Sequence, residues 1–289
     1  MKYNFVISNI RIEGNSIDEL LQQTEKVAGS MDYTVLIEDI KSFIQNLDPQ
    51  MPIILEENEN QSFLAHLEYG RHHNTPYHKI SYKKSFVYWQ HSVVHELMHL
   101  EMYIKASKAG KGYVIKKNLE NDIYFKQTFG AAFRKLIPRY GIEMVEGLQK
   151  MVQDGIITQL LSCPLDLFVE QNIYDRYKDI AVLQLLSLLH QERTNINQYS
   201  DPTVSFMPPK IVSVNKTLCL TNSMRLKEFY GLDFLECYKA NGHERKLSAE
   251  LYEEFLAYKN TFHDGDEYEL YDYFSEVLGI ENIVNKVKE

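Results

Sequence analysis

Strand-like alternation of apolar and polar residues is confined to the first third of the chain, and helical spacing of apolar residues dominates the rest. The first 84 residues predict strands and helices separated by turns that contain Gly, Asn or Pro. Ser16 and Glu19 mark one helix start, because they have the spacing of a capping box. The predicted elements are a strand at residues 3–12, helices at 16–28 and 33–47, and short strands at 52–55, 62–69 and 77–83.

A long apolar helix is predicted over residues 85–110. Ser85 can cap its start, the segment 86–109 contains neither Pro nor Gly, and Gly110 supplies a stop. Beyond it the spacing is helical almost throughout. The helices predicted there cover residues 118–137, 142–153, 163–177, 179–192, 216–231 and 248–288.

The order of these elements predicts an α+β fold. A sheet portion over residues 1–84 is followed by the helix of residues 85–110 and a helical part at 111–200. Prolines at 202, 208 and 209 interrupt the helical pattern and predict a linker. We therefore expect one domain over residues 1–200 and a helical C-terminal extension over residues 210–289.

The helix of residues 85–110 carries the only pronounced chemical motif, His95-Glu96-Leu97-Met98-His99. Histidines four residues apart lie on one helix face, so that His95 and His99 can converge on a single metal ion. Glu96 points aside, outside the set of metal ligands but within reach of a water at the metal. The alternative is a buried helix whose two histidines hydrogen-bond the backbone.

These residues resemble the active-site helix of the zincin metallopeptidases. The extended sequence pattern of that family has uncharged residues around the two histidines. Val93 and Leu100 fit this pattern, whereas Glu101 departs from it. The resemblance covers about thirty residues. It implies a zincin-like α+β fold, a zinc ion (Zn²⁺) held by His95 and His99, and a cleft in which Glu96 is the general base for hydrolysis of a peptide or protein substrate.

The same resemblance implies a role for the strand before the active-site helix. In zincins this strand often lies at the sheet edge and pairs with extended substrate backbone. Residues 77–83 are the candidate here. The alternative is an ordinary edge strand protected from association by its lysines.

A catalytic zinc ion needs a third protein ligand, which the glutamate-type zincins take from a downstream helix. We expect Glu170, because an unpaired carboxylate on such an apolar helix is costly to bury and a metal relieves that cost. Glu120, 21 residues after His99, is the main alternative. The other candidates are Glu143, Glu146 and His190, with Asp166 or Asp175 as carboxylates that orient a ligand or as ordinary surface acids.

Seven of the ten histidines lie between His66 and His99. His91 stands four residues before His95, but three ligands along two turns of one straight helix span too far to close on one ion. We therefore expect the additional histidines to be surface or structural residues. Three residues are candidates for stabilising the oxyanion, and the sequence does not distinguish them: Tyr174, Tyr177 and His190.

Composition limits the classes of binding partner and the cellular compartment that we expect. The formal net charge of −9 and a pI near 5.6 disfavour nucleic acid and anionic membranes. The N-terminus lacks a secretory pattern, no apolar stretch is long enough to span a membrane, and the three cysteines are few and widely spaced. These features predict a cytoplasmic protein.

Two other classes of function compete with a peptidase. A di-iron bundle uses a Glu-x-x-His element, but it needs a second copy that the chain lacks. A zincin-like module that binds metal or a partner without catalysis needs no general base, so the intact Glu96 argues against it. The sequence therefore predicts a zinc-dependent hydrolase, with a silent sensor or interaction protein as the alternative.

Overall fold

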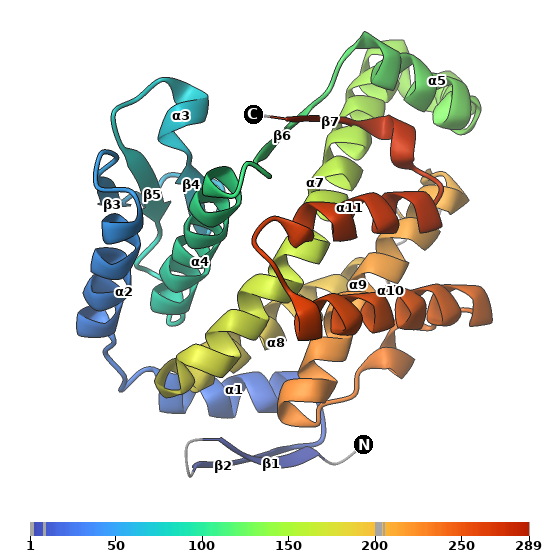
Figure 1. Ribbon diagram of the computed structural model, residues 1–289. Helices are drawn as coiled ribbons and strands as arrows, with labels where there is room; N and C mark the ends of the chain where they lie inside the picture. The colour runs from blue at the N-terminus through green and yellow to red at the C-terminus, as the bar shows by residue number, and fades with distance from the viewer. Residues whose placement is uncertain (1–2, 8–9, 200–203, 205, 289) are drawn as a thin grey trace. The chain divides into compact units, whose positions relative to one another are not determined.

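The computed structural model describes residues 3–7, 10–199, 204 and 206–288 (Figure 1). The fold is α+β, with small sheets and a mostly helical part after residue 110. No helix within these residues is both long and apolar enough to cross a membrane. The chain divides into two compact units, the first made of Met1–Ala109, Phe168–Arg193 and Glu228–Leu232, the second of Gly110–Leu167, Thr194–Lys227 and Asp233–Glu289.

This division differs from the boundary expected at residues 200–210. Three long helices pass from one unit to the other, so each unit is built from separate stretches of chain. Part of the predicted linker, residues 200–203 and 205, lies outside the described residues. The structure does describe Pro209, which begins a helix.

The first unit holds the sheets of the N-terminal third and the motif helix. Its elements are β1 (Tyr3–Ile7), β2 (Ile10–Gly14), α1 (Ile17–Ala28), α2 (Thr34–Leu47), β3 (Ile53–Glu57), β4 (Ala65–Glu68), α3 (Gly70–His73), β5 (His78–Tyr82) and α4 (Trp89–Lys108). The last turns of α7 (Ile142–Arg176), the short η1 (Lys178–Ile180), most of α8 (Ala181–Gln198) and the end of α9 (Pro209–Tyr230) complete it.

The start of α1 follows the predicted cap. The Ser16 hydroxyl accepts a hydrogen bond from the Glu19 backbone N–H at 3.2 Å, which satisfies a donor at the helix end. The Glu19 carboxylate accepts the Asn15 N–H at 2.9 Å. Where one strand was expected at residues 3–12, the structure has two, β1 and β2, which pair antiparallel.

The sheet next to α4 has the order β3-β5-β4. β5 pairs in parallel with β3 and antiparallel with β4, so it is the central strand. The prediction that residues 77–83 form an edge strand is therefore wrong. Burial agrees with the central position, since Ile80 is completely buried and Ser81 nearly so. Alternation within one strand does not show which strands flank it.

Helix α4 ends as predicted but begins later. It starts at Trp89, because Ser85 forms hydrogen bonds to Glu59 through its hydroxyl and its N–H, at 2.7 and 2.9 Å, in place of a cap. At the other end Gly110 has a φ of +68°, the left-handed conformation that glycine adopts without strain. α2 packs along α4 (Figure 1), and the apolar residues around the motif are buried as expected.

The second unit is mostly helical. It contains the first part of α7, and its other elements are β6 (Tyr113–Lys116), α5 (Leu119–Arg134), α6 (Ile137–Tyr140), most of α9 (Pro209–Tyr230), η3 (Leu235–Tyr238), α10 (Gly242–Thr261), α11 (Asp266–Val277), η4 (Glu281–Ile283) and β7 (Asn285–Lys288).

Two predictions for this part are corrected. The helices expected at 142–153 and 163–177 form one 35-residue helix, α7, which continues through Gly155 and Pro164. Gly is only mildly unfavourable in a helix, and buried neighbours such as Leu160 and Leu167 offset the hydrogen bond that Pro164 removes. The segment 248–288, expected to be helical throughout, contains most of α10 and the separate helix α11, and it ends in β7, which pairs with β6.

Glu267, at the start of α11, is 1% exposed. Burial raises the pKa of its carboxyl group from 4.5 to about 7, although its side chain accepts the Gly265 N–H at 3.0 Å. The folded state therefore holds this proton more tightly than the unfolded chain does. The resulting stability is fully present below pH 4.5 and is lost as the pH rises through about 7.

We therefore expect Glu267→Gln to make the protein less sensitive to alkaline pH. The difference between pKa values of 4.5 and about 7 corresponds to about 3 kcal/mol, the largest relative stabilisation expected at pH 8.5 compared with pH 4.5. Urea unfolding of both proteins across this range measures it. The matched control is Glu269→Gln, a half-exposed carboxylate on the same helix. Parallel pH profiles for wild type and Glu267→Gln would contradict the assignment.

Candidate metal centre

The two motif histidines lie one turn apart on α4, with their rings close together. The Nε2 atoms of His95 and His99 are 3.1 Å apart, and the ring centroids are separated by 4.7 Å. Both side chains are half-buried, while Leu97 and Met98 between them pack in the core. The helical period thus brings the two nitrogens together as predicted.

Glu170, on the part of α7 that belongs to the first unit, reaches the opposite side of the His95 ring. One carboxylate oxygen lies 2.8 Å from His95 Nδ1, and the other lies 3.2 Å from His91 Nε2. Glu170 is 2% exposed. The sequence predicted a carboxylate at the motif from this helix, and the structure places it against the outer nitrogen of His95.

A hydrogen-bond network behind Glu170 holds its carboxylate in place. The Gln184 amide on α8 donates to the Glu170 carboxylate at 2.7 Å and also to its backbone carbonyl at 2.8 Å. The Tyr230 hydroxyl donates to the Gln184 side-chain oxygen at 2.9 Å. Sequence reasoning missed both residues. The one available signal was Gln184 itself, a polar residue inside the apolar stretch of α8.

Electrostatics favour an ionised Glu170. Burial by itself opposes ionisation, but His91 and His95 outweigh it, through their charge when they are protonated and through their hydrogen bonds, and hold the pKa of Glu170 well below its usual range. An ionised Glu170 accepts the Nδ1–H of His95, which leaves the Nε2 lone pair directed toward His99. It also accepts Nε2–H from His91, whose buried Nδ1 has no hydrogen-bond partner in the described structure.

A third group that could hold a metal lies on the same helix. α7 continues unbroken from Asp166 to Glu170, so these two carboxylates are one helical turn apart. His95, His99 and Asp166 each offer one ligand atom, and these atoms lie within 4.8 Å of one another. Within the described part of the chain, this group contains Asp166 and not Glu170.

The donor set fits zinc. Zinc accepts imidazole nitrogen and carboxylate oxygen, and two nitrogens bound to one tetrahedral zinc ion at 2.0–2.1 Å lie about 3.3 Å apart. The observed 3.1 Å between the His95 and His99 nitrogens is close to this value. Metal-binding histidines commonly donate their other N–H to a carboxylate, as His95 does to Glu170.

Glu96 lies between the two histidines in sequence and is half-buried on α4. Its carboxylate forms no hydrogen bond or ion pair with any residue that the structure describes. The group is therefore not committed to a structural contact, which leaves it available to accept a proton.

Glu101, which departs from the zincin pattern, has a structural partner. Its carboxylate is 3% exposed and lies 2.8 Å from Arg176 at the end of α7 and 2.6 Å from Lys105. A buried charge is tolerated when it is paired in this way. The departure therefore reflects packing between the helices of the first unit, on a part of α4 beyond the metal-binding pair.

The other predicted candidates lie elsewhere. Glu120 is exposed on the first turn of α5 in the second unit, as are Glu143 and Glu146 on α7. Among the residues considered for the oxyanion, the Tyr174 hydroxyl donates to the Phe229 carbonyl at 3.1 Å, and the Tyr177 hydroxyl accepts from Arg176 at 2.9 Å.

His190, a candidate both for metal binding and for stabilising the oxyanion, contacts Glu25 and Tyr88. Its Nε2 lies 2.9 Å from the Glu25 carboxylate, and its ring stacks on Tyr88 with 5.0 Å between centroids.

No protein family model, no curated protein and no solved structure matches this chain.

Proposed function

We propose that this protein is a zinc-dependent hydrolase, and specifically a metallopeptidase with a zincin-like catalytic centre. The observation that carries the proposal is the approach of the His95 and His99 Nε2 atoms to 3.1 Å, with a buried carboxylate on the outer nitrogen of His95. This arrangement brings two imidazole nitrogens to about the separation that one tetrahedral ion requires. The unpaired Glu96 on the same helix supplies the proton acceptor that hydrolysis needs.

The contacts of the two carboxylates on α7 suggest different roles. We assign Asp166 as the third metal ligand, because its carboxylate oxygen lies within 4.8 Å of the ligand nitrogens of His95 and His99. Both oxygens of Glu170 are already engaged by His91, His95 and Gln184, which suits a residue that orients His95. Glu170 as the ligand, the expectation from sequence, is the alternative that the experiment below distinguishes.

The proposed hydrolysis uses the metal ion and two carboxylates, each with a different role. Bound zinc would supply the Lewis acidity that makes water nucleophilic near neutral pH and polarises a carbonyl group. Glu96 takes the proton from the attacking water and passes it to the leaving amine nitrogen. Glu170 keeps the proton of His95 on Nδ1, so that Nε2 keeps its lone pair.

The first test is the metal content of purified protein. We expect about one zinc ion per chain after loading, and loss of most of it in His95→Ala, His99→Ala and Asp166→Ala, because each removes one of three ligands. Glu170→Gln should keep zinc but bind it 10 to 100 times more weakly, as removal of an orienting partner does. Elemental analysis and titration with a zinc indicator measure both quantities.

The outcomes separate the candidates. Zinc retained in Asp166→Ala and lost in Glu170→Gln would make Glu170 the ligand. Zinc retained by both histidine variants would overturn the site. The zinc-loaded wild type should also cleave a denatured protein such as casein. Zinc binding without hydrolysis of any peptide or amide substrate would favour the alternative function, a metal-binding sensor or interaction protein.

A further inference from the structure

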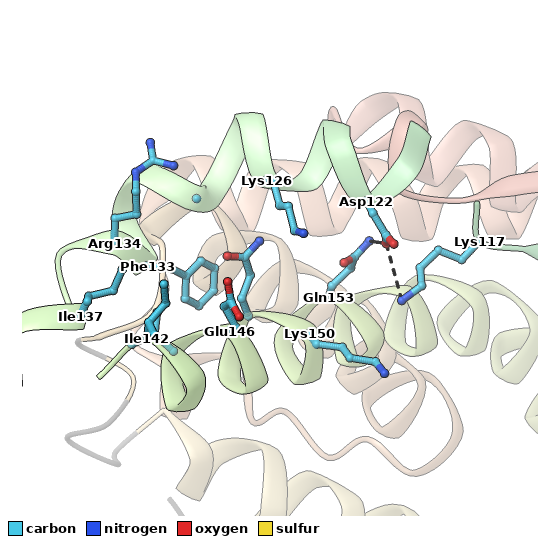
Figure 2. Close-up of a pocket in the computed structure, with 13 residues that line it drawn as sticks. Lys117, Asp122, Lys126, Phe133, Arg134, Ile137, Ile142, Glu146, Lys150 and Gln153 are labelled. Carbon is cyan, nitrogen blue, oxygen red and sulfur yellow. Dashed lines mark hydrogen bonds and ion pairs between the residues drawn. The ribbon is translucent and has the colours of Figure 1, made fainter. Parts of the chain in front are cut away.

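The second unit contains a cavity of about 550 Å³ between α5 and the first turns of α7 (Figure 2). This volume lies within the usual range for small-molecule sites. All the residues that line it belong to the second unit, and none of them is His95, His99 or Asp166, so the cavity is separate from the metal centre.

One end of this cavity is positively charged. Lys117, Lys126 and Lys150 line it, and Figure 2 shows Lys126 reaching from α5 into the space between the helices. Lys117 is neutralised by Asp154 at 2.8 Å. Lys126 and Lys150 form no ion pair with any residue that the structure describes. Two lysine charges therefore remain uncompensated at one place in a chain whose net charge is −9.

The polar wall at this end has a fixed arrangement. The Gln153 side chain is buried, at 5% exposure, and its amide donates to the Asp122 carboxylate at 3.0 Å. Asp122 also lies 3.7 Å from Lys117. These contacts occupy Asp122 and leave it a poor counter-ion for Lys126 and Lys150.

The other end of the cavity is apolar. Phe133, Ile137 and Ile142 gather there in Figure 2, where α6 connects α5 to α7. Ile142 is 57% exposed, so an apolar surface remains open to solvent. Arg134 belongs to the same end, but its guanidinium points away from the space between the helices in Figure 2. Glu146 lies between the two ends.

We propose that this cavity binds an anionic amphiphile, a molecule with one carboxylate or phosphate head and an apolar chain. The head would lie between Lys126 and Lys150, where it neutralises their charges, and the chain would cover Ile137 and Ile142, which keep surface open to solvent. Burial of the chain contributes about 0.8 kcal/mol per CH₂. Each half alone binds weakly because the cavity is open, so affinity requires both parts in one molecule.

The separation of a positively charged end from an apolar end favours an anionic amphiphile over other classes of ligand. A wholly polar anion, such as phosphate, leaves the apolar end exposed to water. A wholly apolar molecule leaves the lysines uncompensated, and a cationic amphiphile is repelled by them. Nucleic acid requires a more extensive basic surface than two unpaired lysines provide.

The probes for the test are octanoate and octyl phosphate, at concentrations at which they remain monomeric. Calorimetry on the full-length protein should show binding of one or both, which identifies the head group. Acetate, inorganic phosphate, octanol and octyltrimethylammonium should bind at least tenfold more weakly. Raising the salt concentration should weaken binding, because the lysines are exposed. Equal binding of the anionic and cationic octyl compounds would overturn the proposal, as would binding of none.

Variants locate the site. Lys126→Ala combined with Lys150→Ala should weaken the anionic probes about tenfold or more, since two charge contacts are lost. Ile142→Asn should weaken octanoate while leaving the preference for an anion unchanged. Lys135→Ala, which removes an equal charge from the end of α5 outside the cavity, is the control. Unchanged binding in the double lysine variant, confirmed as folded by circular dichroism, would place the probes elsewhere and overturn the proposal.

Discussion

Replacing Glu96 with Gln should lower the hydrolytic rate by about 10² to 10⁴, the usual contribution of general acid–base catalysis. The amide has nearly the same size and polarity as the carboxylate but cannot accept the proton of the attacking water. Zinc content should stay at the wild-type level, because Glu96 is not among the close ligand atoms. Initial rates on the cleaved substrate and elemental analysis of the same samples measure the two effects.

A matched variant controls for general effects of losing a carboxylate. Glu38→Gln makes the same chemical change on α2, in the same unit, at an exposed site where the carboxylate pairs with Lys41 at 3.3 Å. Its rate should equal that of the wild type. If Glu96→Gln retained full activity with zinc bound, Glu96 would have no role as the base, and the proposed mechanism would be wrong.

Replacing Glu170 with Ala should destabilise the metal-free protein by about 3–5 kcal/mol, the usual effect of breaking a buried charged pair. The change leaves the nitrogens of His91, His95 and Gln184 without their acceptor in the core. It also creates a cavity where the side chain was. Urea unfolding with a chelator present measures this effect without a contribution from zinc.

The isosteric variant Glu170→Gln distinguishes the effect of losing the charge from the effect of losing the side-chain volume. It keeps the volume, and its oxygen can still accept one hydrogen bond, so we expect a smaller loss of stability than for Glu170→Ala. Asp175→Asn is the control, since Asp175 lies on the same helix but is exposed and bonded to Gln171 at 2.8 Å. A wild-type free energy of unfolding in Glu170→Ala would show that the buried network does not stabilise the first unit.

Residues close in sequence determined much of what could be predicted. The cap at Ser16, the stop at Gly110 and the four-residue spacing of His95 and His99 all depend on neighbours within one or two turns. Such features follow from local geometry, because capping and helical period need no knowledge of the rest of the chain. The presence of Glu170 near the motif was also inferable, since a buried carboxylate needs a partner.

Contacts between distant residues determined what the sequence did not reveal. β5 became the central strand because β3 pairs in parallel on its far side. Gly155 and Pro164 stayed within one helix because packing outweighs their local preferences. The engagement of Glu170 by His91 and Gln184 depends on residues 79 and 14 positions away. Local propensities amount to about a kcal/mol or less per ordinary residue, whereas burial and buried hydrogen bonds contribute more and depend on which segments meet. The sequence by itself therefore determined the motif and the helix that carries it, and only the tertiary structure decided which groups surround it.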